Sequence, residues 1–194
     1  MKTKAIVLAA GRSSRMGSNK LLLMLDDKIV IEHILDNLVG FETIVVTGHR
    51  PEDIRAIAER RGAKVVYNPD YERGMTISFQ AGLRIVEPDV EAVFMVLSDT
   101  FGFKQAIFDE MISKMEIEGA LLVSPIYKGK RGHPVLVSKQ LFPEFLKLGT
   151  NETMKDLVQR HDGDHRYVEG DIWTVLDLDT PRDYEQVKKL WATR

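Results

Sequence analysis

Near its start the chain reads Ala5-Ile6-Val7-Leu8-Ala9-Ala10-Gly11-Arg12, a short apolar run that stops at a glycine and an arginine. Its apolar residues are successive rather than alternating, which is typical of a strand buried on both faces, as in a parallel sheet covered by helices. The run is too short for the core of a signal peptide. We therefore predict a buried first strand, Ala5–Leu8, followed at once by a loop.

Similar runs recur along the chain and alternate with helical patterns. Further strands are predicted at Thr43–Thr47, Ala63–Tyr67, Ala92–Leu97, Ala120–Ser124, His133–Val137 and Thr174–Leu178. Helices are predicted at Ile31–Leu38, Pro51–Arg61, Thr76–Val86, Lys104–Met115 and Pro181–Trp191. The alternation predicts one α/β domain over residues 1–194, a three-layer α/β/α sandwich around a mostly parallel, Rossmann-like central sheet.

Two segments depart from this alternation. Residues 125–132 are rich in glycine and lysine and predict a turn or a mobile loop. Between residues 149 and 164 we predict one helix, Glu152–Arg160, and then a turn at Asp162-Gly163-Asp164.

The composition narrows the function classes. The 194 residues are 44% apolar and 29% charged, which is ordinary for a globular protein, and the formal net charge is -2. This balance disfavours nucleic-acid binding driven by counterion release. The chain has no cysteine, which excludes disulfides, thiolate zinc sites and thiol catalysis. No stretch approaches the roughly 18 apolar residues of a membrane span, so we expect a soluble, cytoplasmic protein without membrane contact.

The loop after the first strand has the composition of a phosphate-binding loop. Ligands of open α/β sheets bind beyond the carboxyl ends of the strands, where small residues admit a ligand to the backbone and free amides bind phosphate oxygens. Three cations within nine residues could neutralise a triphosphate. The residues concerned are Leu8, Ala9, Ala10, Gly11, Arg12 and Ser13, with Arg15 and Lys20 further along the loop.

Spacing excludes two other phosphate motifs. A P-loop has four residues between its glycines and continues Gly-Lys-Ser/Thr. Here five residues separate Gly11 from Gly17, and Leu21 follows Lys20. A dinucleotide fingerprint needs three glycines in the pattern G-x-G-x-x-G, and only the first is present. The alternative to a phosphate loop is a basic surface turn that merely contains glycine.

Residues Leu8–Lys20 resemble the L-A-A-G-x-S-x-R-M-G-x-x-K signature of the molybdenum cofactor cytidylyltransferases. That family belongs to the nucleotidyltransferase superfamily, together with the molybdopterin guanylyltransferases and the sugar-phosphate nucleotidyltransferases. The resemblance implies the nucleotide-diphospho-sugar transferase type of fold. Four further segments match the family in order: Gly74-Met75-Thr76-Ile77-Ser78 (G-M-x-x-S), Leu97-Ser98-Asp99 (the metal aspartate), Gly132-His133-Pro134-Val135 (G-H-P-V) and Asp177–Tyr184 (D-I-D-T-P-x-D-Y).

Two segments depart from the family pattern. After the metal aspartate the family has Gln-Pro or a similar x-Pro, where this chain has Thr100-Phe101. The family's G-D-x-G-A-R segment is missing, and Gly149-Thr150-Asn151-Glu152-Thr153 stands near its place. Both departures lie where the second substrate would be held, so they concern the identity of the acceptor rather than the chemistry.

Three aspartates are candidate ligands for a divalent cation, since carboxylate oxygens suit Mg²⁺. Asp99 follows a buried strand at the end where ligands bind, and its alternative role is a helix cap, which Thr100 could supply instead. Asp177 and Asp179 are two apart on a predicted strand and so point to one face. Their alternative is a solvated strand end that caps the helix starting at Pro181. We expect Asp99 and Asp179 to converge on one Mg²⁺, with Asp177 as a supporting or alternate ligand.

The resemblance also implies contacts to a second, phosphorylated substrate. The G-M-x-x-S segment opens a predicted helix whose free amides could bind an anion, although a plain helix start explains the same spacing. The histidine of G-H-P-V is a candidate through the family match alone, because a lone histidine is more often structural. The spacing of His161 and His165 matches no zinc pattern. The candidate acceptor residues are Gly74, Met75, Ser78 and His133.

These features predict nucleotidyl transfer, in which an acceptor phosphate attacks the α-phosphorus of a nucleoside triphosphate and pyrophosphate leaves. The attacking oxygen is already anionic, so catalysis is alignment plus charge neutralisation by Lys20, Arg15 and a metal on Asp99. By resemblance the substrates are CTP and molybdopterin carrying molybdenum, and a molybdoenzyme is the client of the product. We expect CTP over GTP because guanylyl relatives carry a second glycine at the position of Ala10.

Two alternatives stay open. The first is the same chemistry with GTP, or with a sugar or alcohol phosphate as acceptor. The second is a non-catalytic, cofactor-binding accessory protein for molybdenum hydroxylases, which the departure at Thr100-Phe101 motivates. The presence of Lys20, Asp99 and Asp179 argues against the accessory role, since binding alone needs no metal clamp.

Overall fold

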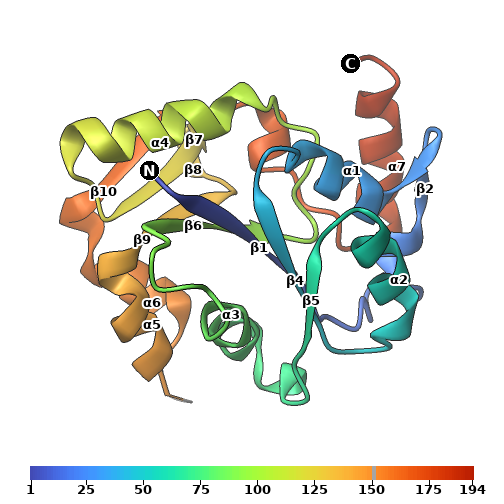
Figure 1. Ribbon diagram of the computed structural model, residues 1–194. Helices are drawn as coiled ribbons and strands as arrows, with labels where there is room; N and C mark the ends of the chain where they lie inside the picture. Colours follow the sequence, from blue (N-terminus) through green and yellow to red (C-terminus); the bar gives the residue numbers. More distant parts are fainter. Residues whose placement is uncertain (150–151) are drawn as a thin grey trace.

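The computed structural model describes residues 1–149 and 152–194, and a mixed β-sheet forms its centre (Figure 1). In the described ranges eight strands pair in the order β10-β7-β9-β6-β1-β4-β5, with β8 beside β7. A separate small hairpin consists of β2 (Met24–Leu25) and β3 (Lys28–Ile29). The strands of the main sheet are β1 (Thr3–Ala9), β4 (Glu42–Thr47), β5 (Lys64–Tyr67), β6 (Ala92–Leu97), β7 (Leu122–Tyr127), β8 (Lys130–Arg131), β9 (Val135–Ser138) and β10 (His165–Glu169).

Parallel pairing dominates the sheet, as predicted. β1 is parallel to both β4 and β6, β4 to β5, and β7 to β10. β9 is inserted antiparallel between β6 and β7, and β8 is the return strand of a hairpin from β7. Because β1 and β6 run side by side in the same direction, their carboxyl ends meet at one edge of the sheet.

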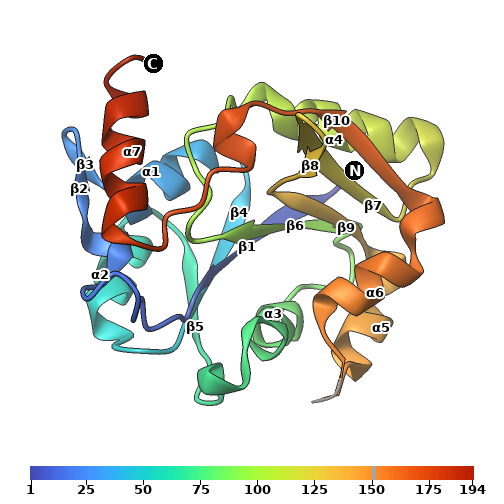
Figure 2. The ribbon, with the colours of Figure 1, turned by 180° about the vertical axis from the view of Figure 1, so that it is seen from behind.

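Helices cover both faces of the sheet, which confirms the three-layer sandwich (Figure 1, and from behind in Figure 2). Alternate residues of β1 show the division: Val7 belongs to one core and Ile6 to the other, and both are fully buried. One face carries α1 (Val30–Asn37), α2 (Glu52–Arg60), α4 (Ala106–Glu118) and α7 (Pro181–Trp191). The opposite face carries α3 (Met75–Leu83), α5 (Phe142–Lys147) and α6 (Met154–Arg160).

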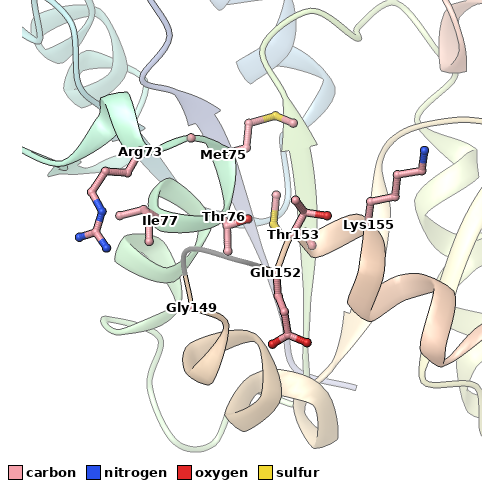
Figure 3. A pocket seen from close by; sticks show the side chains of 10 residues that line it. Arg73, Met75, Thr76, Ile77, Gly149, Glu152, Thr153 and Lys155 are labelled. Carbon is pink, nitrogen blue, oxygen red and sulfur yellow. The ribbon is translucent and has the colours of Figure 1, made fainter.

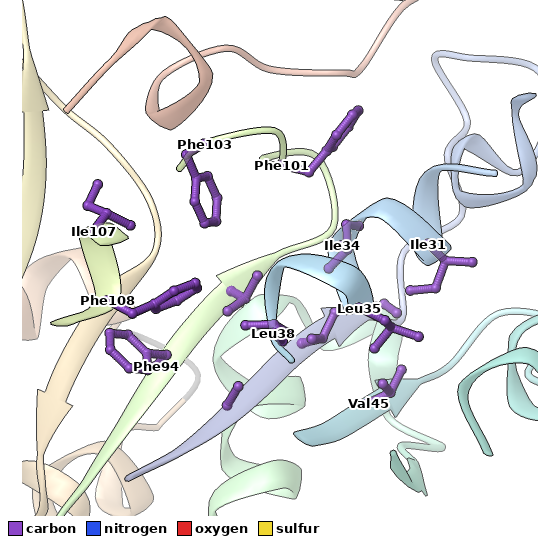
Figure 4. Close-up of a cluster of buried hydrophobic side chains, with 14 of the residues drawn as sticks. Ile31, Ile34, Leu35, Leu38, Val45, Phe94, Phe101, Phe103, Ile107 and Phe108 are labelled. Atoms are coloured by element: carbon purple, nitrogen blue, oxygen red, sulfur yellow. The ribbon is translucent and has the colours of Figure 1, made fainter. Parts of the chain in front are cut away.

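The first of these cores is rich in aromatic rings (Figure 4). Phe94 of β6 meets Phe108 of α4 edge-on with ring centroids 4.7 Å apart, and Phe103 packs on Phe108 in the same manner. Such pairs add to the stabilisation that burial alone supplies. The segment that leaves β6, which carries Phe101 and Phe103, is therefore anchored in the core.

The predicted strand Thr174–Leu178 is wrong. Its first residue ends a 3-10 turn, η5 (Ile172–Thr174), and the rest runs to α7 without pairing to a described strand. The carbonyl of Thr174 accepts a hydrogen bond from His133 N at 2.8 Å, which is a contact between loops. Leu178 is fully buried and anchors the segment in the core. The segment therefore has the apolar pattern of a strand in the sequence without being one.

Strand β10 was not predicted from the sequence. It lies at the edge of the sheet and is made of His165-Arg166-Tyr167-Val168-Glu169, of which His165 and Val168 are buried. Mostly polar side chains give an edge strand a weak hydrophobic pattern. The strand pairs with β7 and so carries His165 into the interior, where the sequence indicated only the end of a turn.

Other segments match their predictions more closely. Residues 125–132 form the β7–β8 hairpin, whose turn residues Lys128 and Gly129 have φ angles of 47° and 79°. Helix α6 and the following turn, η4 (Asp162–Asp164), lie where they were predicted. Over the described ranges, none of the helices combines the length and apolarity that crossing a membrane requires.

Candidate active site

Lys20, Asp99 and Asp179 meet beyond the carboxyl ends of β1 and β6. Lys20 Nζ lies 2.9 Å from Asp179 Oδ1 and 3.3 Å from Asp99 Oδ2. The two carboxylates therefore face one point on the same side of the sheet. Asp177 belongs to the cluster electrostatically: desolvation raises the pKa of this carboxyl, and the charges of Asp99 and Asp179 raise it further, although the residue keeps exposed surface.

Local turns place Lys20 in this position. Ser13, with a φ of 51°, accepts a hydrogen bond from Met16 N at its carbonyl and from Lys20 N at its hydroxyl. Asn19 caps the 3-10 turn η1 (Lys20–Leu22), and Met16 is buried beneath the loop. The Lys20 side chain is left only 11% exposed. An ammonium that has lost most of its water needs carboxylate partners, and the cluster supplies two.

Asp99 lies in the segment between β6 and α4. Helix α4 starts only at Ala106, with Gln105 at its cap, so the capping alternative for Asp99 and Thr100 does not apply. The Thr100 hydroxyl donates to Asp99 Oδ1 at 3.3 Å, which leaves Oδ2 facing Lys20. The Asp99 carboxylate is therefore oriented toward the edge where ligands of α/β sheets bind.

Asp179 is held by the first turn of α7, so the reasoning that set Asp177 and Asp179 on one face of a strand is wrong. Thr180 and Asp183 form a capping box, and Asp183 Oδ2 accepts from the backbone N–H groups of Asp179 at 3.1 Å and Thr180 at 2.7 Å. Because Thr180 is the cap, the Asp179 carboxylate is left for other partners. It pairs with Arg15 Nη2 at 2.7 Å as well as with the buried lysine.

This cluster fits a divalent cation that is shared with a phosphate group. In the part of the chain that the structure describes, no three histidines or carboxylates form a cage that could hold a metal by themselves. Mg²⁺, however, is usually bound by one or two carboxylates together with substrate phosphates and water. Asp99 and Asp179 offer such a pair of oxygen donors, which suits a hard cation, and they already surround the positive charge of Lys20.

The residues predicted to bind the nucleotide lie at the carboxyl end of β1 and in the loop that follows it. Leu8, Ala9 and Ala10 are buried, and Ala10 O accepts a hydrogen bond from His49 N at 3.1 Å, which ties this loop to the end of β4. At Gly11 an added Cβ would meet no atom of the described chain within 4 Å. The space over the Gly11 backbone is therefore open to a ligand.

Arg12 has protein partners in this structure. Its guanidinium forms an ion pair with Glu72 and lies over the ring of Tyr71, 5.8 Å from the centroid. Both partners belong to η2 (Tyr71–Arg73), the turn that precedes α3. A phosphate bound by Arg12 would have to compete with Glu72, and one bound by Arg15 with Asp179, although the Arg15 side chain is 71% exposed.

A cleft of about 710 Å³ opens beside the carboxylate cluster. Leu97, two residues before Asp99, is part of its wall. Desolvation lowers the pKa of His133 in the cleft, and the negative charge of Asp99 opposes this shift. The lining residues are Met75, Met95, Leu97, Ser124, Arg131, Gly132, His133, Val135, Met154, Lys155, Val158, Gln159, Asp162 and His165.

Figure 3 shows a smaller pocket of about 460 Å³ between the first turns of α3 and α6. It shares Met75, Met154 and Lys155 with the cleft, so the two hollows adjoin. Gly74 lines the pocket at the N-cap of α3 with a φ of 104°, a conformation that favours glycine. Ser78 is buried and its hydroxyl is hydrogen-bonded inside the core, so it lies behind the walls of both hollows rather than in them.

The described residues of the two departures from the family pattern are not among the residues that line the cleft. Thr100 and Phe101 are buried, and Phe101 packs toward α1 and α7 on the other face of the sheet. Thr150 and Asn151 lie outside the described residues. Glu152, next to them, lines the smaller pocket.

Sequence reasoning missed six polar residues of the cleft: Ser124, Arg131, Lys155, Gln159, Asp162 and His165. Ser124 lies in a predicted strand and His165 beside a predicted turn, and only the pairing of β7 with β10 brings them together. Arg131 had a signal, because it belongs to the basic, glycine-rich segment before G-H-P-V. The apolar cleft residues carry no signal that separates them from the core.

Comparison with known proteins identifies the family. The family model described as the MobA-like NTP transferase domain matches residues 5–168. The molybdenum cofactor cytidylyltransferase of Escherichia coli (strain K12) is 31% identical over 191 residues, which cover 96% of each chain. The probable molybdenum cofactor guanylyltransferase of Natranaerobius thermophilus is 25% identical, over 95% of this chain and 94% of that protein.

Solved structures share this fold over nearly the whole chain. Rv0371c from Mycobacterium tuberculosis H37Rv superposes with a TM-score of 0.84 at 30% identity, covering 97% of this chain and 98% of that one. The same protein solved in complex with manganese gives a TM-score of 0.80 at 27% identity, over 97% and 99%. The chain thus belongs to the MobA-like NTP transferase family and is a nucleotidyltransferase.

Proposed function

We propose that this nucleotidyltransferase transfers CMP from CTP to the phosphate group of a molybdopterin-type acceptor, with Mg²⁺, and releases pyrophosphate. The observation that carries the proposal is that the carboxylate cluster and the cleft lie next to each other. Lys20 lies between Asp99 and Asp179 at the strand ends, and a cleft that contains Arg131 and Lys155 lies beside them. The first site suits a triphosphate and the second a phosphorylated partner. On this proposal the client of the product is a molybdoenzyme.

The proposed reaction depends on alignment more than on acid–base chemistry. An oxygen of the acceptor phosphate forms a bond to the α-phosphorus of CTP, the bond from that phosphorus to the bridging oxygen breaks, and pyrophosphate leaves with the electron pair. No proton has to be removed, since the attacking oxygen is anionic. Lys20 and Arg15 would neutralise the charge that develops on the triphosphate oxygens. Mg²⁺ held by Asp99 and Asp179 would supply further neutralisation.

Lys20 has two sets of partners in this scheme. In the free protein its ammonium separates two carboxylates that would otherwise repel each other and raise one another's pKa. When a cation shared with CTP satisfies those carboxylates, Lys20 would turn to the triphosphate. Asp177, which shares their field, would support the same ion.

The base and the acceptor are proposed from resemblance. The loop Leu8-Ala9-Ala10-Gly11 and the similarity to the Escherichia coli cytidylyltransferase favour CTP. GTP is the second candidate, because a probable guanylyltransferase is also among the relatives. The named acceptor of both relatives is the molybdenum cofactor.

Pyrophosphate release from each of the four ribonucleoside triphosphates, with and without purified molybdopterin cofactor and Mg²⁺, tests the proposal. We expect release to be fastest with CTP and to require both the acceptor and the divalent ion. Equal or faster turnover of GTP would overturn the proposed base. If a triphosphate stabilises the protein, by about 2.7 kcal/mol at a hundredfold excess over its Kd, but none is turned over with any phosphorylated acceptor, the accessory role replaces catalysis.

A further inference from the structure

The cleft contains a buried polar pair that lies outside all five family motifs. Ser124 of β7 and His165 of β10 are 1% and 4% exposed, and Ser124 Oγ lies 2.6 Å from His165 Nε2. Both residues line the cleft. The ring of His165 also stacks on Tyr167, with centroids 4.6 Å apart. The imidazole is therefore held at its edge by Ser124 and at its face by Tyr167.

Two histidine nitrogens of the cleft have no hydrogen-bond partner. Nδ1 of His165 and Nδ1 of His133 are buried, and across the described residues they are the buried side-chain polar atoms left without a partner. A buried polar atom without a hydrogen bond costs about 1–3 kcal/mol, so it calls for an explanation such as a ligand. Two such atoms on residues that line one cleft point to a ligand with a polar edge.

Both imidazoles are neutral at neutral pH. Burial lowers the pKa of His165 to about 4; the positive charges of Arg131 and Arg166 lower it further, and Asp162 opposes them. Burial lowers the pKa of His133 as well. A neutral imidazole offers one N–H donor and one lone pair, which match an uncharged ring edge better than a phosphate.

A serine beside a histidine can also be a nucleophile, but this pair is not built for that role. In serine-nucleophile sites a third group binds the other nitrogen of the histidine. His165 Nδ1 lacks such a group in the described ranges.

The other residues that line the cleft include a charged group and an apolar group. Lys155 and Arg131 supply positive charge that suits a phosphate; Arg131 pairs with Asp162, another lining residue, at 2.5 Å, so a phosphate would take over that contact. A volume of about 710 Å³ is that of a small-molecule site, large enough for a bicyclic ring with a phosphorylated side chain. The apolar surface that would face such a ring comes from Met75, Met95, Leu97, Val135, Met154 and Val158.

We propose that Ser124 and His165 select the acceptor by its ring: the imidazole, held by the Ser124 hydroxyl, hydrogen-bonds through Nδ1 to the polar edge of a neutral heterocycle. Arg131 and Lys155 take the phosphate of the same molecule, and His133 is a second contact to the ring. The proposal rests on the proposed function and deepens it, because it names the feature of the acceptor that is recognised. In this scheme Ser124 is a positioning residue that acts through His165.

Fluorescence titration with 6-hydroxymethylpterin, which carries such a ring without a phosphate, tests the pair. His165→Phe keeps an aromatic ring that can stack on Tyr167 but has no nitrogen. We expect it to weaken pterin binding about tenfold, equivalent to one hydrogen bond of about 1.4 kcal/mol. Ser124→Ala should weaken binding about threefold. The matched control is His161→Phe, since His161 pairs with Glu144 and is not among the cleft residues described.

A second readout separates recognition from a structural role. In ¹⁵N-histidine-labelled protein, pterin should shift the Nδ1 resonance of His165, and inorganic phosphate should not. CTP with Mg²⁺ should raise the Tm of every variant by the same amount as that of the wild-type protein. This readout uses the wild-type chain and so decides the matter even if His165→Phe does not fold.

The outcomes that overturn the inference differ from those that overturn the function. If His165→Phe binds pterin within about twofold of wild type, or if the His165 resonance does not respond, the pair is structural and the proposed transfer still stands. If wild-type protein binds CTP but not pterin, the proposed acceptor is wrong, and the inference is wrong with it.

Discussion

Lys20 is an ammonium that the fold has removed from water and set between two carboxylates. Surface ion pairs are worth about 0–1 kcal/mol, but a partly buried charge is costly without its partners. Polar clusters of this kind concentrate at functional sites, where ligands later take over the contacts. The side chains of Lys20, Asp99 and Asp179 therefore carry the first two predictions.

Lys20→Met should lower the rate of pyrophosphate release by more than about tenfold, or 1.36 kcal/mol of barrier, because the leaving phosphates lose a positive charge. Arg15→Ala should have a smaller effect, since the Arg15 side chain is mostly exposed. Lys28→Met is the matched control, because Lys28 pairs with Asp36 of α1 instead of the cluster. A Lys20→Met rate within about threefold of wild type would show that the loop has another role.

Asp99→Asn should abolish metal-dependent turnover and leave the fold intact, because the amide keeps the size of the side chain but loses its charge. Mn²⁺ titration followed by electron paramagnetic resonance, with CTP present, checks the cause directly: ion binding should be lost in Asp99→Asn. Asp89→Asn, which removes an exposed carboxylate paired with Lys2, serves as the control. Unchanged Mn²⁺ binding in Asp99→Asn would exclude this carboxylate as a ligand.

Helices α6 and α7 both start with a capping box, but they begin at different parts of the site. Thr153 with Asp156 and Thr180 with Asp183 form capping boxes, and only the second also binds the backbone of Asp179. The start of α7 therefore positions a carboxylate of the cluster, whereas the start of α6 borders the cleft. Two helix starts with matched chemistry make a controlled comparison.

Thr180→Ala and Thr153→Ala should each lower the free energy of unfolding by about 1 kcal/mol, the usual value of such a cap. Urea unfolding measures this loss. Only Thr180→Ala should also weaken Mn²⁺ binding in the presence of CTP, because Asp179 loses its fixed position. Equal Mn²⁺ affinity in the two variants would mean that the cap does not position Asp179.

The loop between β6 and α4 depends on a glycine that packs under two tryptophans. Gly102 has a φ of 85°, and an added Cβ would lie 2.9 Å from the rings of Trp173 and Trp191. Gly102→Ala should destabilise the protein by about 2 kcal/mol or more, from overpacking and backbone strain together. Gly62→Ala shares the positive φ but meets open space, and should cost only about 1–2 kcal/mol. Equal losses in thermal unfolding would contradict the packing argument.

How well an element was predicted depended on how local its signals are. Helix α7 has the predicted bounds, because Thr180, Pro181 and Asp183 mark its start within the sequence itself. Strand β10 was missed because its partner β7 lies about forty residues away and its own side chains are mostly polar. The segment after Thr174 was mistaken for a strand because burial, not pairing, makes it apolar.

Across the whole molecule, local sequence signals predicted one part of the site, the carboxylate cluster, but not the other part, the cleft. The cluster of Lys20, Asp99 and Asp179 was predicted: Lys20 and Asp99 lie in loops that follow buried strands, and parallel strands end at one edge. Asp179 was placed there from a strand that does not form, and the start of α7 holds it instead. The Ser124–His165 pair was not predicted, because the order β10-β7-β9-β6 is set by packing of the complete sheet. Hydrophobic patterns locate strands but do not order them.

Tracing the α- and γ-phosphates of CTP tests most directly whether this site performs the proposed transfer. CTP labelled at the α-phosphorus, and in parallel at the γ-phosphorus, is incubated with the protein, Mg²⁺ and molybdopterin cofactor. We expect the α-label to appear in the acceptor and the γ-label in pyrophosphate, in equal amounts, and neither to move with Asp99→Asn. Release of the α-label as free CMP or CDP, or no movement of either label with wild-type protein, would contradict cytidylyl transfer at this site.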